Sequence, residues 1–270
     1  YGPSSSHTMG PRAAAEQYLL KHPEAKRFQV TLYGSLAATG RGHLTDWAIL
    51  DVIGKERCEI KWCAEIVLPY HPNGMLFQAI DDAGKPYDPW TVYSVGGGAL
   101  AEEGHSSIQT PDIYELNHLN DIIKWCDERG YSYWQFVEHF EESDIWDYLE
   151  EVWKIMRQAV ERGLETEGVL PGGLNLRRKA PHYYIKAQGY SANLQTRGLV
   201  FAYALAVTEE NASGGRIVTA PTCGSCGVVP AVLYHIQQSR NFSTKRILHA
   251  LATAGLIGNI AKTLASISGA

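Results

Sequence analysis

The spacing of apolar residues changes near Gly104, and this change constrains the fold more than any other feature of the chain. Before Gly104, residues 28–32 alternate between apolar and more polar positions, which is the period of a half-buried strand. After Gly104, the apolar residues between 145 and 160 recur about every 3.6 residues, as on one face of a long helix. The two patterns in succession predict an α+β fold, with an α+β domain over residues 1–104 and an all-helical domain over residues 105–270.

Further elements are expected in each part. Turn-forming residues at 81–86 separate two β-rich runs, so these runs are expected to form a hairpin. Pro11 and Thr45 each mark a helix start, and Gly130 marks a helix end. The additional strands are expected over 59–68, 75–80 and 90–95, and the additional helices over 113–129, 194–210 and 228–239.

Composition restricts the classes of partner. The 270 residues carry 24 Lys and Arg against 29 Asp and Glu, a net charge of −5, with no basic block that would neutralise a phosphate backbone. The longest apolar stretch, residues 199–207, is far shorter than the roughly 20 residues of a membrane span. Five cysteines without a secretory signal argue for reduced thiols. We therefore expect a cytoplasmic protein with no nucleic-acid or membrane partner.

A hydroxyl-rich segment at the start of the chain is the first candidate site. Residues 2–8 combine four hydroxyls with His7 directly before a helix start, where backbone N–H groups favour an anion such as a carboxylate. The simpler interpretation is a Ser/Thr helix cap with a spare imidazole. The density of the cluster favours a ligand site.

Two further loops carry a histidine each. Glycines surround His43 in residues 40–46, which lets backbone approach a ligand, and an imidazole can transfer protons near neutral pH. His71 lies in His71-Pro72-Asn73-Gly74, where Asn-Gly is typical of a hairpin turn with an exposed histidine. Three histidine loops in one small domain favour a shared site for proton transfer and carboxylate binding, although the spacing does not establish that they converge.

Cys223 and Cys226 form a Cys-x-x-Cys sequence directly before a predicted helix. Because a helix N-terminus stabilises thiolates, a thioredoxin-like redox site is one hypothesis. The helical surroundings count against it, and the simplest interpretation is a tight turn of small residues. Residues 96–98 are three glycines, but neither a dinucleotide-binding pattern nor a P-loop lysine follows them.

Taken in order, the motifs resemble those of the bacterial iron-sulfur L-serine dehydratases, also called L-serine ammonia-lyases. The resemblance covers essentially the whole chain. The matching segments are residues 2–11, 34–46 and 71–75 in the first part, and residues 167–172, 211–216, 219–230 and 265–270 in the second.

The resemblance implies a lyase that converts L-serine to pyruvate and ammonia without pyridoxal phosphate. In this family a helical domain holds an oxygen-sensitive [4Fe-4S] cluster, one iron of which acts as a Lewis acid. A base removes the α-proton, hydroxide leaves to the metal, and the resulting enamine is hydrolysed. The positions that match the family's catalytic residues are His7, His43, His71 and Asn73, and the resemblance does not decide which histidine is the base.

The resemblance also implies substrate-binding positions and an oligomeric state. Hydroxyl and backbone groups of both parts are expected to line the site, and family members often form homodimers. The expected substrate-binding residues are Ser4, Ser5, Ser6, Thr8, Thr222, Gly224, Ser266 and Ser268.

The chain departs from the family pattern in its cysteines. The family's Glu-x-Gly-Cys motif and its two later cysteine motifs are not in this sequence, so no metal ligand is assigned within the chain and the cluster cysteines are expected beyond Ala270. We therefore expect a fragment, truncated at the C-terminal end of its helical domain, that binds no complete cluster and is inactive by itself. A non-catalytic amino-acid-binding module is the alternative.

Overall fold

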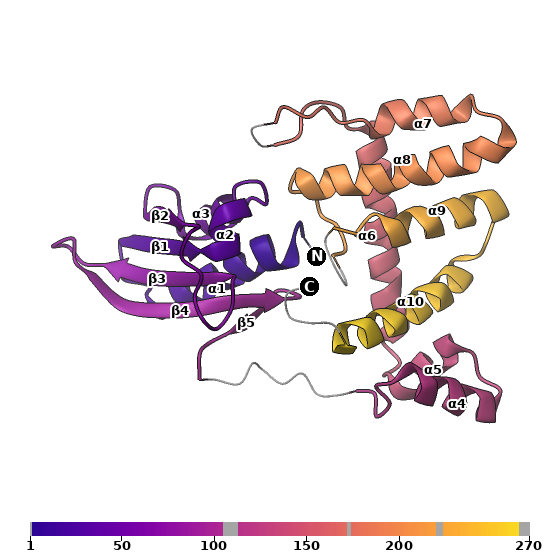
Figure 1. Ribbon diagram of the computed structural model, residues 1–270, viewed down its shortest axis with the longest axis horizontal. Coiled ribbons are helices and arrows are strands. Elements are labelled where there is room, and N and C mark those ends of the chain that lie inside the picture. Colours follow the sequence, from indigo (N-terminus) through magenta and orange to yellow (C-terminus); the bar gives the residue numbers. More distant parts are fainter. Residues whose placement is uncertain (1, 105–112, 172–173, 220–223, 265–270) are drawn as a thin grey trace. The chain divides into compact units, whose positions relative to one another are not determined.

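The chain divides into two compact units, and each has its own secondary structure (Figure 1). The computed structural model describes residues 2–104, 113–171, 174–219 and 224–264. The first unit comprises Tyr1–Gln109 and Pro171–Asn175, and the second comprises Thr110–Leu170 and Leu176–Ala270. The predicted boundary between residues 104 and 105 falls at the edge of residues that lie outside the described ones. The α+β class expected from the sequence is confirmed.

One five-stranded sheet forms the centre of the first unit, in the order β2-β1-β3-β4-β5 (Figure 1). The central strand β1 is parallel to β2 and antiparallel to β3, and the predicted hairpin between residues 75 and 95 is confirmed as the antiparallel pair β3 and β4. The strand predicted over 59–68 is shorter than expected. The strands are β1 (Arg27–Tyr33), β2 (Cys58–Cys63), β3 (Gly74–Ile80), β4 (Pro86–Gly96) and β5 (Ala99–Ala101).

Helices α1, α2 and α3 accompany this sheet. A single π-helical turn, η1 (Ser5–Met9), continues directly into α1 (Gly10–Lys21), while α2 (Gly34–Thr39) and α3 (Thr45–Ile53) lie in the crossover from β1 to β2. Tyr18 of α1 is buried in the core of the unit, where its hydroxyl accepts a hydrogen bond from the Ala79 N–H (2.9 Å) and donates one to the Asp88 carbonyl (2.6 Å). This hydroxyl therefore ties α1 to two strands.

In the part that the structure describes, the second unit is helical. The long predicted helix is α6, and its apolar stripe from Leu149 to Val160 is buried as expected. The helix predicted over 113–129 begins at Leu119 because residue 118 is extended, and it ends before Gly130, which takes a left-handed conformation as predicted. The helices are α4 (Leu119–Arg129), α5 (Tyr133–Phe140), α6 (Ile145–Glu165), α7 (Ala180–Gln188), α8 (Ala192–Ala212), α9 (Val228–Arg240) and α10 (Thr244–Leu264).

Two glycines let neighbouring segments approach the backbone of α8. A Cβ atom on Gly163 of α6 would lie 2.4 Å from the Ala206 carbonyl oxygen, and one on Gly227 would lie 2.3 Å from the Ala204 carbonyl oxygen. Real Cβ atoms do not approach backbone so closely, so both positions require glycine. None of the helices in the described residues is long and apolar enough to cross a membrane.

Candidate active site

His7 is held by three serine hydroxyls around the η1 turn. Ser4 Oγ accepts a hydrogen bond from the His7 backbone N–H (3.2 Å). In the imidazole ring, Nδ1 lies 2.9 Å from Ser6 Oγ and Nε2 lies 3.1 Å from Ser35 Oγ. Both ring nitrogens therefore have a hydroxyl partner, and the ring orientation is fixed.

The loop that carries His43 is joined to the His7 turn by two threonines. Thr8 Oγ1 donates to the His43 carbonyl (2.6 Å), and Thr45 Oγ1 donates to the His7 carbonyl (2.5 Å). The two imidazole rings lie 4.9 Å apart, measured between their centroids. The convergence of these two loops, which the spacing in the sequence could not establish, is thus present.

His71 lies in the connection between β2 and β3. Its side chain is only 6% exposed, and its Nδ1 accepts a hydrogen bond from the Asn73 backbone N–H (3.1 Å). The Asn73 amide donates to the Ser94 carbonyl of β4 (3.2 Å). The hairpin interpretation with an exposed histidine is wrong, because β1 lies between β2 and β3 and the side chain is buried.

The hydrogen bond from Asn73 determines where the proton sits on His71. A backbone N–H can only donate, so Nδ1 of the neutral ring must be the acceptor and Nε2 carries the proton. His71 therefore presents an N–H donor from Nε2. Protonation of Nδ1 would remove this hydrogen bond and is disfavoured.

Gly34 and Ser35 connect the His71 loop to His7. Gly34 has a φ of +49°, and a Cβ atom there would lie 2.5 Å from the Pro72 carbonyl oxygen. This close approach lets the Ser35 N–H donate to the same carbonyl (3.0 Å) while the Ser35 hydroxyl contacts the His7 ring. Ser35 was not among the predicted site residues. The signal available in the sequence was its position directly after Gly34, the glycine that follows β1.

Burial keeps all three imidazoles uncharged near neutral pH. It lowers the pKa of His7 to about 4, with a smaller contribution from the neighbouring His43 and an opposing one from a hydrogen bond with Ser35. Burial also lowers the pKa of His43 and of His71. Neutral imidazoles can accept a proton at one nitrogen and donate from the other, as general acid-base catalysis requires.

The other predicted substrate-binding residues fall into two groups. Ser4, Ser5, Ser6 and Thr8 all lie at the η1 turn, and Ser4 and Thr8 are buried. Gly224 lies in the turn before α9 in the second unit. Predicted residues that lie outside the described ones are Thr222, Ser266 and Ser268, together with Cys223 of the Cys-x-x-Cys sequence.

The described cysteines do not form a cluster site. Cys58 and Cys63 lie on β2, whereas Cys126 and Cys226 are buried in the second unit. Burial raises the pKa of Cys58 to about 12, which opposes the thiolate form that metals and redox chemistry need. Within the described ranges no group of three His, Cys, Asp or Glu side chains could hold a metal ion. These residues therefore do not fit a [4Fe-4S] cluster.

A second polar cluster, which was not predicted, is centred on two adjacent carboxylates near the end of α8. Glu209 and Glu210 are only 3% and 5% exposed. Glu209 accepts hydrogen bonds from the backbone N–H groups of Lys179 (2.7 Å) and Ala180 (3.3 Å), so it caps the N-terminus of α7. We refer to Glu209 and Glu210 with their partners as the glutamate cluster.

Glu210 is paired with two arginines. Its carboxylate oxygens accept from Arg162 Nε of α6 and from a terminal nitrogen of Arg178, each at 2.9 Å. Arg162 also donates to the Arg216 carbonyl (2.8 Å), and the Gly215 N–H donates to the Glu210 carbonyl (2.8 Å). The cluster therefore fixes α6, α8 and the turn after α8 to one another.

Comparison with known proteins agrees with the motif order. The family model described as "Serine dehydratase alpha chain" matches residues 23–270. Similar proteins include the L-serine dehydratase of Haemophilus influenzae and the L-serine dehydratase TdcG of Escherichia coli, each 35% identical over all of this chain and 71% of the relative. The L-serine dehydratase of Mycobacterium tuberculosis is 36% identical over all of this chain and 70% of the relative. The chain belongs to the serine dehydratase family.

Proposed function

We propose that this protein is an L-serine dehydratase, a lyase that converts L-serine to pyruvate and ammonia. Proteins that are similar to this chain over its full length carry that name. The observation that carries the proposal is the pair of uncharged imidazoles, His7 and His43, joined through threonine hydroxyls and linked by Ser35 to the His71 loop. An α,β-elimination needs a base and a proton donor at one place, and this arrangement supplies both.

His43 is the best candidate for the base. Both ring nitrogens of His7 have hydroxyl partners, and Nδ1 of His71 is occupied by the Asn73 N–H. The His43 ring has no hydrogen bond from any described residue, and its lowered pKa keeps it in the basic form. It would first take the α-proton of L-serine. The bond from Cβ to the hydroxyl then breaks, and the hydroxide takes up this proton and leaves as water. The aminoacrylate so formed takes up water and releases pyruvate and ammonia.

His71 is the candidate donor. Its Nε2–H is fixed by the hydrogen bond at Nδ1, so it would bind an oxygen atom of the substrate rather than remove a proton. Asn73 positions it through the contact with β4. The hydroxyls of Ser4, Ser6 and Thr8 keep the turn that carries His7 in place.

The described residues do not supply the ligands of a [4Fe-4S] cluster, so no step of the reaction is assigned to a cluster. We expect the 270-residue chain to bind well below four irons after anaerobic reconstitution and to have no dehydratase activity by itself. Iron and sulfide analysis tests this expectation, and about four irons per chain would contradict it.

The roles of the histidines are tested by substitution in the active enzyme. We expect His43→Asn to lower kcat by about 10²–10⁴-fold, the usual contribution of a general base, and to stop exchange of the serine α-proton in D₂O. His71→Asn should mainly raise KM for L-serine. His118→Asn, at an exposed position, is the control. If His43→Asn retained both exchange and turnover, His43 would not be the base. If the unsubstituted enzyme bound L-serine without turnover, the binding-module alternative would be favoured.

A further inference from the structure

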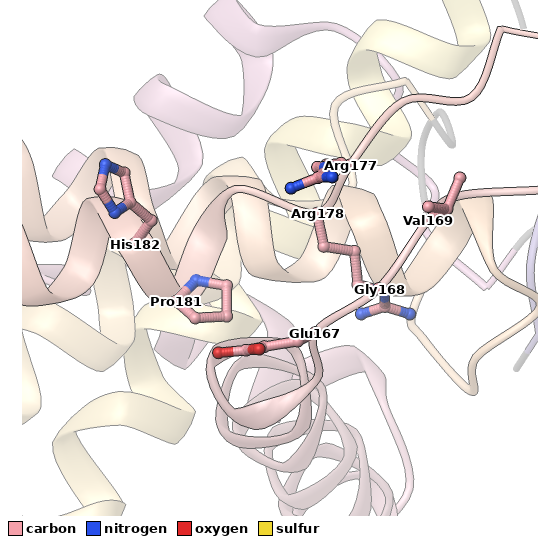
Figure 2. Close-up of a pocket in the computed structure, with 7 residues that line it drawn as sticks. All are labelled: Glu167, Gly168, Val169, Arg177, Arg178, Pro181 and His182. Atoms are coloured by element: carbon pink, nitrogen blue, oxygen red, sulfur yellow. The ribbon is translucent and has the colours of Figure 1, made fainter.

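A pocket of about 430 Å³ lies in the second unit, and Arg178 of the glutamate cluster is one of the residues that line it (Figure 2). It is lined by residues 167–169 after α6, by the two arginines at 177 and 178, and by the first turn of α7. Its charged and titratable residues are Glu167, Arg177, Arg178 and His182. The volume is within the range typical of small-molecule sites.

Backbone hydrogen bonds fix the two sides of this pocket. Val169 and Arg177 form an antiparallel bridge, and the Arg178 N–H donates to the Gly168 carbonyl (2.9 Å). The Leu170 N–H donates to the Leu176 carbonyl (2.7 Å). Glu167 and Arg177 thus lie on two segments that these hydrogen bonds hold together.

Arg178 is oriented in advance by the glutamate cluster. Its side chain is only 6% exposed, and one of its five N–H donors is used by Glu210. The other donors have no acceptor among the described residues. Arg162, whose side chain is 41% exposed, shares the same carboxylate, and with Glu209 the glutamate cluster has no net charge. The attraction for an anion therefore comes from the unused N–H donors of the buried Arg178 guanidinium group.

Arg177 and Glu167 carry opposite charges, and no described side chain is paired with either of them. Neither makes an ion pair or a side-chain hydrogen bond there, although both line the same cavity. The nearby N-terminus of α7 is already occupied, since Glu209 accepts from its first N–H groups. An incoming carboxylate would therefore use the guanidinium groups rather than the helix end.

We propose that this pocket binds a free α-amino acid, with its carboxylate on Arg177 and Arg178 and its ammonium group on Glu167. A guanidinium matches the two oxygens of a carboxylate, and the glutamate carboxylate accepts hydrogen bonds from an ammonium group. The inference goes beyond the proposed function, because it concerns binding by the second unit and requires none of the three histidines.

The test is a titration followed by the backbone amide resonances of Gly168, Val169 and His182. The probes are L-serine, L-lactate, which lacks the ammonium group, and ethanolamine, which lacks the carboxylate. We expect L-serine to shift these resonances in a saturable manner, and each of the other two to bind at least about 10-fold more weakly, the effect of one lost charge-assisted hydrogen bond.

Variants separate this pocket from the histidine site. Arg177→Gln should weaken L-serine binding by about 10-fold or more, and Glu167→Gln should weaken binding of L-serine but not of L-lactate. Arg197→Gln, an exposed arginine of α8, is the matched control. His43→Asn should leave these shifts unchanged even if it abolishes activity. Equal binding of L-lactate and L-serine, no effect of Arg177→Gln, or loss of the shifts in His43→Asn would each overturn the proposal.

Discussion

The two units give their buried titratable groups different kinds of partner. In the first, three imidazoles are partly withdrawn from water, and their hydrogen-bond partners are hydroxyls and a backbone N–H, so their pKa values fall and they stay neutral. In the second, the buried carboxylates of Glu209 and Glu210 receive arginine and helix N–H donors. A neutral partner leaves a group able to exchange protons, whereas a charged partner fixes its charge. The first arrangement suits catalysis and the second suits architecture and anion binding.

The largest expected effect comes from breaking the glutamate cluster. Glu210→Leu leaves Arg162 and Arg178 without their carboxylate, and removal of one partner of a buried ion pair costs about 3–5 kcal/mol of unfolding free energy. Urea denaturation of the variant measures this loss. Glu165→Gln, an exposed position at the end of α6, should change stability by less than about 0.5 kcal/mol. A loss below about 1 kcal/mol for Glu210→Leu would show that the cluster is not structural.

The spacing of α6 and α8 is expected to be nearly as sensitive. Gly163→Ala places a methyl group against the Ala206 backbone, and such overpacking costs about 1–3 kcal/mol. Gly255→Ala in α10 has no atom within 4 Å of its new methyl group, and an exposed helical Gly→Ala change stabilises by up to about 1 kcal/mol. The midpoint of thermal unfolding should therefore fall in Gly163→Ala and rise in Gly255→Ala. Equal shifts would contradict the packing argument.

The neutrality of the imidazoles predicts a pH dependence of stability. His7 has a folded pKa of about 4, below its unfolded value near 6.5, so the unfolded state binds more protons between these pH values. The contribution of His7 to the free energy of unfolding is complete above about pH 6.5 and is lost as the pH falls toward 4. His7→Gln should flatten this part of the profile, measured by urea denaturation at each pH. A His7 Cε1–H resonance that titrates near pH 6.5 in the folded protein would refute the prediction.

The smallest effect concerns a single hydroxyl. Thr45 is fully buried, and Thr45→Val removes its hydrogen bond to the His7 carbonyl at almost constant volume, with an expected cost of about 1 kcal/mol. Thr39→Val is the control, because the exposed Thr39 hydroxyl bonds only to the carbonyl one turn earlier in its own helix. The difference between the two midpoints in urea isolates the contact between the His7 and His43 loops. If the two variants were equally stable, this contact would contribute nothing.

Local patterns were sufficient to predict much of the fold. The alternation in residues 28–32 and the turn at 81–86 located β1 and the β3–β4 hairpin, because strand period and turn chemistry are properties of neighbouring residues. The strand predicted to residue 68 ends at Cys63, and Ile66 and Val67 are exposed despite their β-branched side chains. Helix α7 was missed because Tyr183 and Ile185 are exposed, so its apolar residues do not form a stripe.

The sites depended on contacts that no local pattern contains. The histidine loops were predicted, but Ser35 joins His7 from 28 positions away in the sequence. The glutamate cluster was missed because charged residues at a helix end are normally exposed. Glu210 is buried only because Arg178 and Arg162 reach it from 32 and 48 positions away.

The strand order β2-β1-β3 has a consequence for how the first unit folds. His71 lies in the connection between β2 and β3, which pair with opposite edges of β1, and Ser35 follows β1 directly. The loop can take its final shape only after both edges of β1 are filled, and the parallel pairing with β2 first requires closure of the crossover that contains α2 and α3. We therefore expect the His71 ring to be buried late in refolding. Because burial lowers its pKa, the release of its proton would report this step.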